Sequence, residues 1–272
     1  MVQLAALDQV EERFRAFQGV QVEPDVQQPG YTIDVEFLGG LTEGQKTLFK
    51  SAARRWSRVI SGDVPDVNVG GRIIDDILIQ ASGIDIDGEG RVLGRAGPTR
   101  IRQGSKLPAA GIMEFDVADL AAMEADGRLE DVIVHEMGHC LGIGTLWQEM
   151  GLITGAGGPD PVFTGTRAIA EYSALTGETE QSIPVENTGG AGTRDGHWRD
   201  SVFGNEMMTG FISSRGNPIS RMTVAALGDM GYGVHLGGAE PYSLPGPSLL
   251  ASWSFSLDGL EVERPDYETV GD

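Results

Sequence analysis

Hydrophobic and polar residues alternate with a period of two over residues 31–38, which predicts a strand with one buried face. Thr42 and Gln45 then form a capping-box pattern, and apolar residues recur at helical spacing from residue 48 to residue 60, before Gly62. The short apolar run at residues 77–81 is consistent with a second, buried strand. This part of the chain is therefore predicted to be a strand–helix–strand unit with its two strands side by side.

Three more elements are predicted before residue 142. Two strands fit residues 91–96 and 111–116, and a loop that contains Pro98 and Pro108 is expected between them. A helix is expected to begin at Asp131 and to run to about residue 141, because apolar residues come directly after Asp131 and a glycine ends the pattern.

The second half of the chain carries fewer periodic signals. Residues 148–196 are rich in glycine and polar residues, which is typical of loops, but one helix is predicted within them at residues 166–175. Another helix is predicted at residues 220–229. The tail beyond residue 237 is expected to be irregular structure packed on the body, and residues 65–71 are expected to form a loop.

Composition excludes several classes of protein. With 272 residues, 40% of them apolar, the chain can bury a sizeable core. It has no run of about 18 apolar residues, and its first twenty residues mix charges with hydrophobics, so we expect neither a transmembrane helix nor a signal peptide. The net charge of -20 disfavours nucleic acid as a partner. The single cysteine, Cys140, excludes an internal disulfide.

A metal site is predicted on the helix that begins at Asp131. His135 and His139 are four residues apart, so their imidazoles project from one face of the helix and can share one ion, and Glu136 lies beside them. Zinc suits neutral imidazole ligands, and a catalytic zinc site needs three protein ligands and a position for water. The HExxH pattern can arise by chance, but two of only four histidines in the chain fall here.

The third ligand must come from elsewhere in the chain. Gly142 can adopt the left-handed conformation that ends a helix and turns the chain away. An extended form of the motif has its third histidine at position 145, which is Thr145 here. His197 and His235 are the remaining histidines. We prefer His197, because it lies eleven residues before Met208, a residue that could form a methionine turn beneath the metal.

Residues 31–236 resemble the leishmanolysin family of metzincin peptidases in three segments: HEMGHCLGIGTLW at 135–147, HW at 197–198 after a long glycine-bearing insertion, and NEMMT at 205–209. The segment at 220–234 is similar to the one that comes after the Met-turn in bacterial relatives of that family. The resemblance implies one catalytic Zn²⁺ ion and assigns three roles. The zinc ligands are His135, His139 and His197, the general base is Glu136, and the Met-turn residue is Met208.

The resemblance also implies the fold. We expect a metzincin-like α+β protein in which a twisted mixed sheet with a backing helix and the zinc-binding active-site helix is followed by a mostly irregular C-terminal subdomain. Residues 1–272 are expected to form a single catalytic domain. Its N-terminal subdomain, residues 25–142, would carry the HExxH motif. Its C-terminal subdomain, residues 143–272, would carry the third histidine and the Met-turn.

A second similarity, to matrixin-type metzincins, concerns the strands at 92–98 and 111–116. It implies that an extended substrate pairs with an edge strand formed by Leu93, Gly94, Arg95 and Ala96. Matrixins have a histidine in this strand for a structural zinc, whereas this chain has Arg95. We therefore expect no second zinc.

The predicted function is zinc-dependent hydrolysis of peptide bonds by an endopeptidase that acts on protein or peptide substrates. A gluzincin-type peptidase, with Glu149 or Glu171 as third ligand, is one alternative. A non-enzymatic zinc-binding or adhesion module on a metallopeptidase scaffold is the other, and the intact Glu136 argues against it. Residues 85–89 resemble a Ca²⁺ loop but lack its full ligand spacing, so we prefer an acidic turn. We expect a monomer, and the resemblance implies extracellular action, although the sequence itself leaves the compartment open.

Overall fold

The computed structural model describes residues 3–24, 26–90, 92–190, 192–210, 212, 216–246 and 261–271. Its largest element is an eight-stranded sheet in the order β12-β7-β8-β6-β3-β1-β2, with β13 also paired to β7. The strands are β1 (Glu12–Phe17), β2 (Val20–Val22), β3 (Thr32–Phe37), β6 (Ile77–Ile84), β7 (Val92–Arg102), β8 (Pro108–Asp116), β12 (Glu261–Glu263) and β13 (Glu268–Val270).

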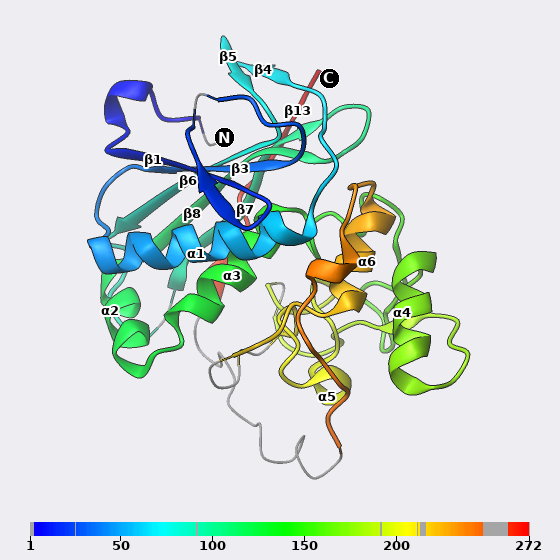
Figure 1. Ribbon diagram of the computed structural model, residues 1–272. Coiled ribbons are helices and arrows are strands. Elements are labelled where there is room, and N and C mark those ends of the chain that lie inside the picture. The colour runs from blue at the N-terminus through cyan, green and yellow to red at the C-terminus, as the bar shows by residue number, and fades with distance from the viewer. Residues whose placement is uncertain are drawn as a thin grey trace.

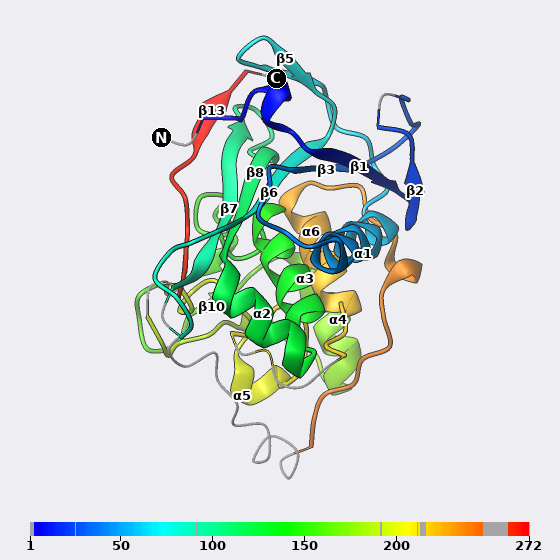
Figure 2. The same cartoon turned by 90° about the vertical axis from the view of Figure 1, so that its left-hand side faces the viewer.

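The sheet is mixed, as expected. Strands β3, β6 and β8 are parallel to one another, whereas β1 and β7 run antiparallel to their neighbours β3 and β8. The two C-terminal strands, β12 and β13, are parallel to β7. Helix α1 (Glu43–Val59) packs on β1 and β3, and helix α3 (Leu129–Cys140) packs beside it on β7 and β8. Both helices thus cover one face of the sheet (Figures 1 and 2).

The strand–helix–strand prediction is confirmed by β3, α1 and β6. The Thr42 hydroxyl accepts a hydrogen bond from the Gln45 amide while the Gln45 side chain accepts one from the Thr42 amide, so both halves of the predicted capping box are present. The helix buries Phe49 and Trp56, together with the alanines between them, in the main hydrophobic core. Val35 pairs with Ile79 in the parallel ladder that joins β3 to β6.

The helix that carries the HExxH motif begins at Leu129, two residues earlier than expected, and comes after a short helix, α2 (Val117–Asp126), that was not predicted. Nearly every residue of α3 is buried. The Trp56 indole of α1 donates a hydrogen bond of 2.8 Å to the carbonyl of Val134, which fixes α3 against its neighbour. Because α3 is buried and fixed to α1, the side chains that it carries have fixed positions.

The second half of the chain is built from short elements. These are β9 (Ile153–Thr154), β10 (Val162–Phe163), α4 (Thr166–Thr176), β11 (Ile183–Pro184), α5 (Asp200–Phe203) and α6 (Arg221–Met230), with 3₁₀ turns at Leu236–Gly238 and, near the N-terminus, Leu7–Gln9. Helices α4 and α6 confirm the predictions at 166–175 and 220–229, and they pack together (Figure 1). A cluster of rings, Trp147, Phe163, Trp198 and Phe203, fills the centre of this half.

Residues 65–71 do not form the expected loop. They contribute β4 (Val67–Val69), which pairs with β5 (Arg72–Ile74) in a hairpin. Gly70 and Gly71 make the two-residue turn between these strands, and both have positive φ, as such a turn requires. Apolar side chains of the hairpin pack with Leu78 and Ala109 of the main sheet in a separate small cluster.

The prolines at 98 and 108 were wrongly expected in a loop. Strand β7 continues through Pro98 to Arg102, and Pro108 is the first residue of β8. Both places suit proline, because Pro98 borders a register shift between β7 and β8, and Pro108 stands at a strand start. The prediction of an irregular tail was also wrong where β12 and β13 join the sheet at β7.

No helix in the described parts of the chain is both long and apolar enough to cross a membrane.

Candidate metal centre

Three histidines meet at one point of the structure. His135 and His139 come from α3, and His197 comes from the loop before α5. Their Nε2 atoms form a nearly equilateral triangle, with separations of 3.0 Å for His135–His197, 3.0 Å for His135–His139 and 2.9 Å for His139–His197. Within the described residues these three side chains form a group that can hold a metal ion.

The outer nitrogens of the three rings fix their tautomers. Nδ1 of His135 lies 2.7 Å from the carbonyl oxygen of Met207, Nδ1 of His139 lies 2.8 Å from that of Ile143, and Nδ1 of His197 lies 2.7 Å from that of Thr193. A carbonyl oxygen only accepts hydrogen bonds, so each Nδ1 carries the proton. In a neutral ring Nε2 is then a bare acceptor.

Three bare Nε2 lone pairs thus face one another with no donor among them. Burial lowers the pKa of His135 to about 4 and lowers the pKa values of His139 and His197 well below the ordinary range, so all three rings are neutral at pH 7. Such an arrangement needs a cation at its centre. Nitrogen donors whose other ring nitrogen is held by a carbonyl are what zinc prefers, so these residues fit a zinc ion.

Glu136 lies beside the triad with its carboxyl group buried. Its Oε2 atom has no hydrogen-bond partner among the described residues. Burial raises the pKa of Glu136 to about 8, and the positive charge of Arg264 acts in the opposite direction. A buried carboxyl oxygen without a partner is rare, and a divalent ion held by the three histidines would lower the pKa of Glu136 again and make it a candidate proton acceptor.

The segment between the second and third histidines folds back on the end of α3. Gly142 has a φ of +96°, the left-handed conformation predicted for it, and the chain turns there. Gly144 then lies directly against the backbone of Gly196, because a β-carbon built on Gly144 would be 1.8 Å from the Gly196 carbonyl oxygen. The rings of Trp147 and Trp198, which follow these glycines, pack against each other at a tilt of 37°, with centroids 4.5 Å apart. These contacts bring His197 to the helix.

Met208 lies under the same part of α3. The amide of Trp198 donates a hydrogen bond of 2.9 Å to the Met208 carbonyl, so the segments with His197 and Met208 are paired. The Met208 sulfur packs on Gly138, since a β-carbon built on Gly138 would lie 2.6 Å from it. The neighbouring Met207 carbonyl accepts the bond from His135. The methionine segment therefore supports both the helix and one histidine.

Comparison with known protein families bears on this arrangement. The family model Peptidase_M8, described as leishmanolysin, matches residues 64–242, which is more than half of the chain and includes the three histidines, Glu136 and Met208. The chain belongs to the leishmanolysin family. This match confirms the resemblance found in the sequence. The members of this family are zinc metallopeptidases. No curated protein matches the chain.

The other residues considered as the third zinc ligand lie elsewhere. Glu149 is exposed and pairs with Lys106, and Glu171 pairs with Arg221. His235 precedes the 3₁₀ turn after α6, where its amide bonds to Val59. Neither glutamate belongs to the group formed by the three histidines.

Two side chains near the site have other structural roles. The Thr145 hydroxyl donates a hydrogen bond of 2.9 Å to the carbonyl of His139 and so caps the end of α3. Arg95, in the predicted substrate-binding strand, pairs with Glu114 of β8.

The turn at residues 85–89 is organised by Asp116. One carboxylate oxygen of Asp116 accepts hydrogen bonds of 2.7–3.1 Å from the amides of Ile86, Asp87 and Gly88. These three hydrogen bonds order the turn, and the preference for an acidic turn over a Ca²⁺ loop stays a prediction.

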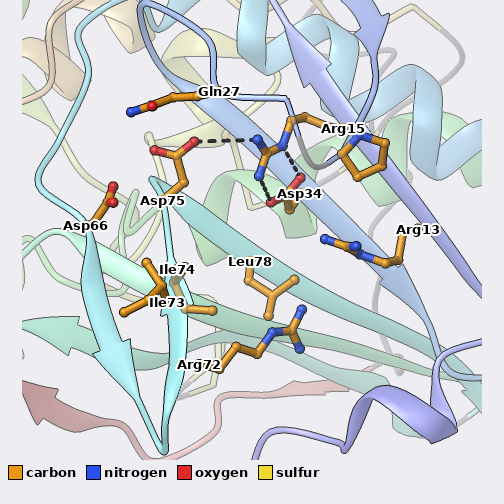
Figure 3. Close-up of a pocket in the computed structure, with 11 residues that line it drawn as sticks. Arg13, Arg15, Gln27, Asp34, Asp66, Arg72, Ile73, Ile74, Asp75 and Leu78 are labelled. Atoms are coloured by element: carbon orange, nitrogen blue, oxygen red, sulfur yellow. Dashed lines mark hydrogen bonds and ion pairs between the residues drawn. The ribbon is translucent and has the colours of Figure 1, made fainter.

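A second acidic cluster lies beside β3, far along the chain from the histidines. Asp63, Asp75 and Asp76 come together there, but both oxygens of Asp76 already accept hydrogen bonds from backbone amides. The adjoining pocket, of about 280 Å³, has Arg15 between Asp34 and Asp75 (Figure 3). Its charges neutralise one another, so the histidine cluster is the better candidate site.

Glu206 is a part of the site that the sequence analysis missed. Its carboxylate is buried, and it accepts hydrogen bonds from the Met208 amide (2.7 Å), the Ser220 amide (3.1 Å), the Ser220 hydroxyl (2.7 Å) and the Thr223 hydroxyl. It thereby ties the methionine segment to the start of α6. The only sequence feature that could have identified Glu206 is its position two residues before Met208. Its burial could not be predicted, because it depends on partners at the start of α6.

We expect Glu206→Ala to lower the free energy of unfolding by about 3 kcal/mol, because the Met208 amide and two hydroxyls lose a charged acceptor inside the core. Urea unfolding checks this value, and Glu178→Ala, which removes an exposed glutamate, serves as the control. Equal unfolding midpoints for the two variants would show that the Glu206 carboxylate does not stabilise the contact between the Met208 segment and the start of α6.

Gly138→Ala tests the contact beneath the helix. The added methyl group must displace the Met208 sulfur or the Trp56 ring, so we expect a loss of about 1–3 kcal/mol in stability, and weaker zinc binding. The control is Gly190→Ala, because a β-carbon on Gly190 meets nothing within 4 Å. A Gly138→Ala protein as stable as the control, with unchanged zinc affinity, would contradict the packing described.

Proposed function

We propose that this member of the leishmanolysin family is a zinc-dependent endopeptidase of the metzincin type, with His135, His139 and His197 as ligands of one catalytic ion and Met208 as the Met-turn residue. The observation that carries the proposal is the convergence of three unprotonated Nε2 atoms, together with the buried, unpartnered oxygen of Glu136, the residue that follows His135 on α3. When bound, zinc supplies Lewis-acid activation of a water molecule and of the scissile carbonyl.

Glu136 is the proposed general base. It accepts a proton from the attacking water and passes it to the departing amine nitrogen. Two observations support this role: the Arg264 guanidinium acts on the pKa of Glu136 and of all three histidines, and Oε2 of Glu136 is not engaged by any other described group. The three carbonyls that hold the Nδ1 atoms keep the imidazoles in the orientation and tautomer that a metal requires.

The proposed substrate is an extended polypeptide that pairs with the edge of β7 along Leu93, Gly94, Arg95 and Ala96. On one side β7 pairs with β8, and its other edge is able to form a ladder, because the chain's own β12 pairs there. Main-chain hydrogen bonds along an edge bind polypeptides of many sequences, which suits an endopeptidase.

We further propose that residues 1–272 act as one catalytic domain, with subdomains 25–142 and 143–272, as a monomer outside the cell. One continuous hydrophobic core that includes residues from both subdomains supports the single domain. The gluzincin alternative is disfavoured, since Glu149 and Glu171 are engaged with Lys106 and Arg221.

The test is to measure zinc content and hydrolysis of casein and a peptide library by the purified chain. We expect about one zinc per chain and cleavage of internal peptide bonds. A chelator should abolish cleavage, and added zinc should restore it. Zinc bound without hydrolysis of any peptide would instead favour the binding module.

A further inference from the structure

The C-terminal segment, residues 261–271, lies along the sheet edge that we propose for the substrate. In β12, Glu261, Val262 and Glu263 pair with Val92, Gly94 and Arg95 of β7. In β13, residues 268–270 pair with residues 100–102 of the same strand. Figure 2 shows this segment in red beside β7. It lies beyond residue 242, where the match to the leishmanolysin family ends.

Between these two strands the segment crosses to the loop that carries the third histidine. The Arg264 guanidinium donates a hydrogen bond of 2.9 Å from Nη2 to the Gly192 carbonyl. The same guanidinium packs on Gly196, the residue before His197, because a β-carbon built on Gly196 would be 2.0 Å from Nη2. Pro265 packs in the same way on Gly97 of β7. Arg264 therefore bridges the two sides of the metal centre.

The histidine cluster and the general base are closed to large molecules. His135 and Glu136 are each 2% exposed, and His139 and His197 are each 5% exposed. Arg264 itself is exposed to solvent and its charge acts on Glu136, so it belongs to the outer layer above the site. A polypeptide cannot reach a zinc ion at this place while the cover stays closed.

We infer that residues 261–271 form an autoinhibitory strap, which occupies the substrate edge of β7 and covers the metal centre until it is displaced. This inference rests on the proposed peptidase function. The two ends of the strap are held differently. Val270 of β13 packs in the small hydrophobic cluster, Glu268 pairs with Arg100, and the pairing of β13 with β7 is regular, whereas the pairing of β12 has a register shift between Glu261 and Val262. Opening would therefore begin at β12 and Arg264, with β13 as the anchor.

The test uses the full zinc-loaded chain with Val262→Ser and Arg264→Ala, singly and together. Val262 packs on the core and Arg264 makes the bridge, so the double variant loosens the strap without altering β7. If the open state holds about 0.1–10% of the wild-type molecules, opening raises kcat/KM by about 10- to 1,000-fold. A lower KM should account for most of the rise, because the strap competes with substrate. Val20→Ser with Arg221→Ala is the matched control, since Val20 is exposed and Arg221 pairs with Glu171.

A second readout does not depend on catalysis. The rate at which a chelator removes zinc should rise in the strap variants and stay unchanged in the control, and amides of β12 should exchange with deuterium faster than those of β8 in the wild type. Unchanged zinc removal and unchanged kcat/KM would overturn the strap. A fall in kcat for Arg264→Ala with zinc retained would also overturn it, because Arg264 would then assist the reaction. Faster zinc removal with no hydrolysis by any variant would overturn the peptidase function, but it would still support the inference that residues 261–271 cover the metal centre.

Discussion

Glu136→Ala is expected to retain zinc and to lower kcat for peptide hydrolysis by about 10²- to 10⁴-fold, the range that general acid–base catalysis contributes. The three imidazoles and the carbonyls that orient them are untouched by this substitution, so the metal-binding group stays complete. Only the unpartnered carboxylate oxygen beside them is removed. Removing a buried carboxyl without hydrogen bonds should also leave the fold as stable as before.

The measurement is zinc content together with steady-state hydrolysis of a peptide cleaved by the wild type. Glu130→Ala is the matched control, because Glu130 lies on the same helix and accepts its hydrogen bond from Ser51, on α1. Glu136→Ala hydrolysis within a few-fold of the control would rule out Glu136 as the base. Loss of zinc from Glu136→Ala would mean that this residue holds the metal directly.

His197→Ala is expected to lose both zinc and activity. Two imidazoles on α3 would remain, one fewer than a catalytic zinc site needs. Loss of a partner outside the coordination shell costs about 10- to 100-fold in metal affinity, so loss of a ligand should cost more than that. The fold should persist, because the neighbouring Trp198 remains in the ring cluster.

His235→Ala is the control for this variant, since His235 was the competing candidate and lies by the 3₁₀ turn after α6. Zinc affinity is measured by competition with a chromogenic chelator. Retention of zinc by His197→Ala, or its loss from His235→Ala, would reverse the choice between the two histidines.

The parts of the fold that sequence could predict are those specified by local patterns. The capping box at Thr42 and the alternation in β3 are readable within a few residues, and so was the end of α3 at Gly142. The β4–β5 hairpin was missed even though Gly70–Gly71 between two alternating segments is a hairpin signal. Its apolar residues pack in a cluster apart from the main core, which gave no reason to expect a strand there.

Other features depend on partners far away in the chain. The polar residues of β12 have no strand pattern of their own and become a strand only by pairing with β7, about 170 residues earlier. Glu206 is buried because Ser220 and Thr223 of another element donate to it. At the site, the helix with the HExxH motif could be predicted from the sequence. The position of His197 could not, because it depends on the close backbone contact between Gly144 and Gly196. Such contacts result from tertiary packing and not from local propensity.

The central claim is that His135, His139 and His197 bind one zinc ion together. Zinc K-edge X-ray absorption on the purified chain tests it most directly. We expect one zinc per chain with three imidazole nitrogens at about 2.0–2.1 Å and one oxygen ligand from water. A first shell with two imidazoles and a carboxylate, or a chain that takes up no zinc when it is folded, would contradict the account.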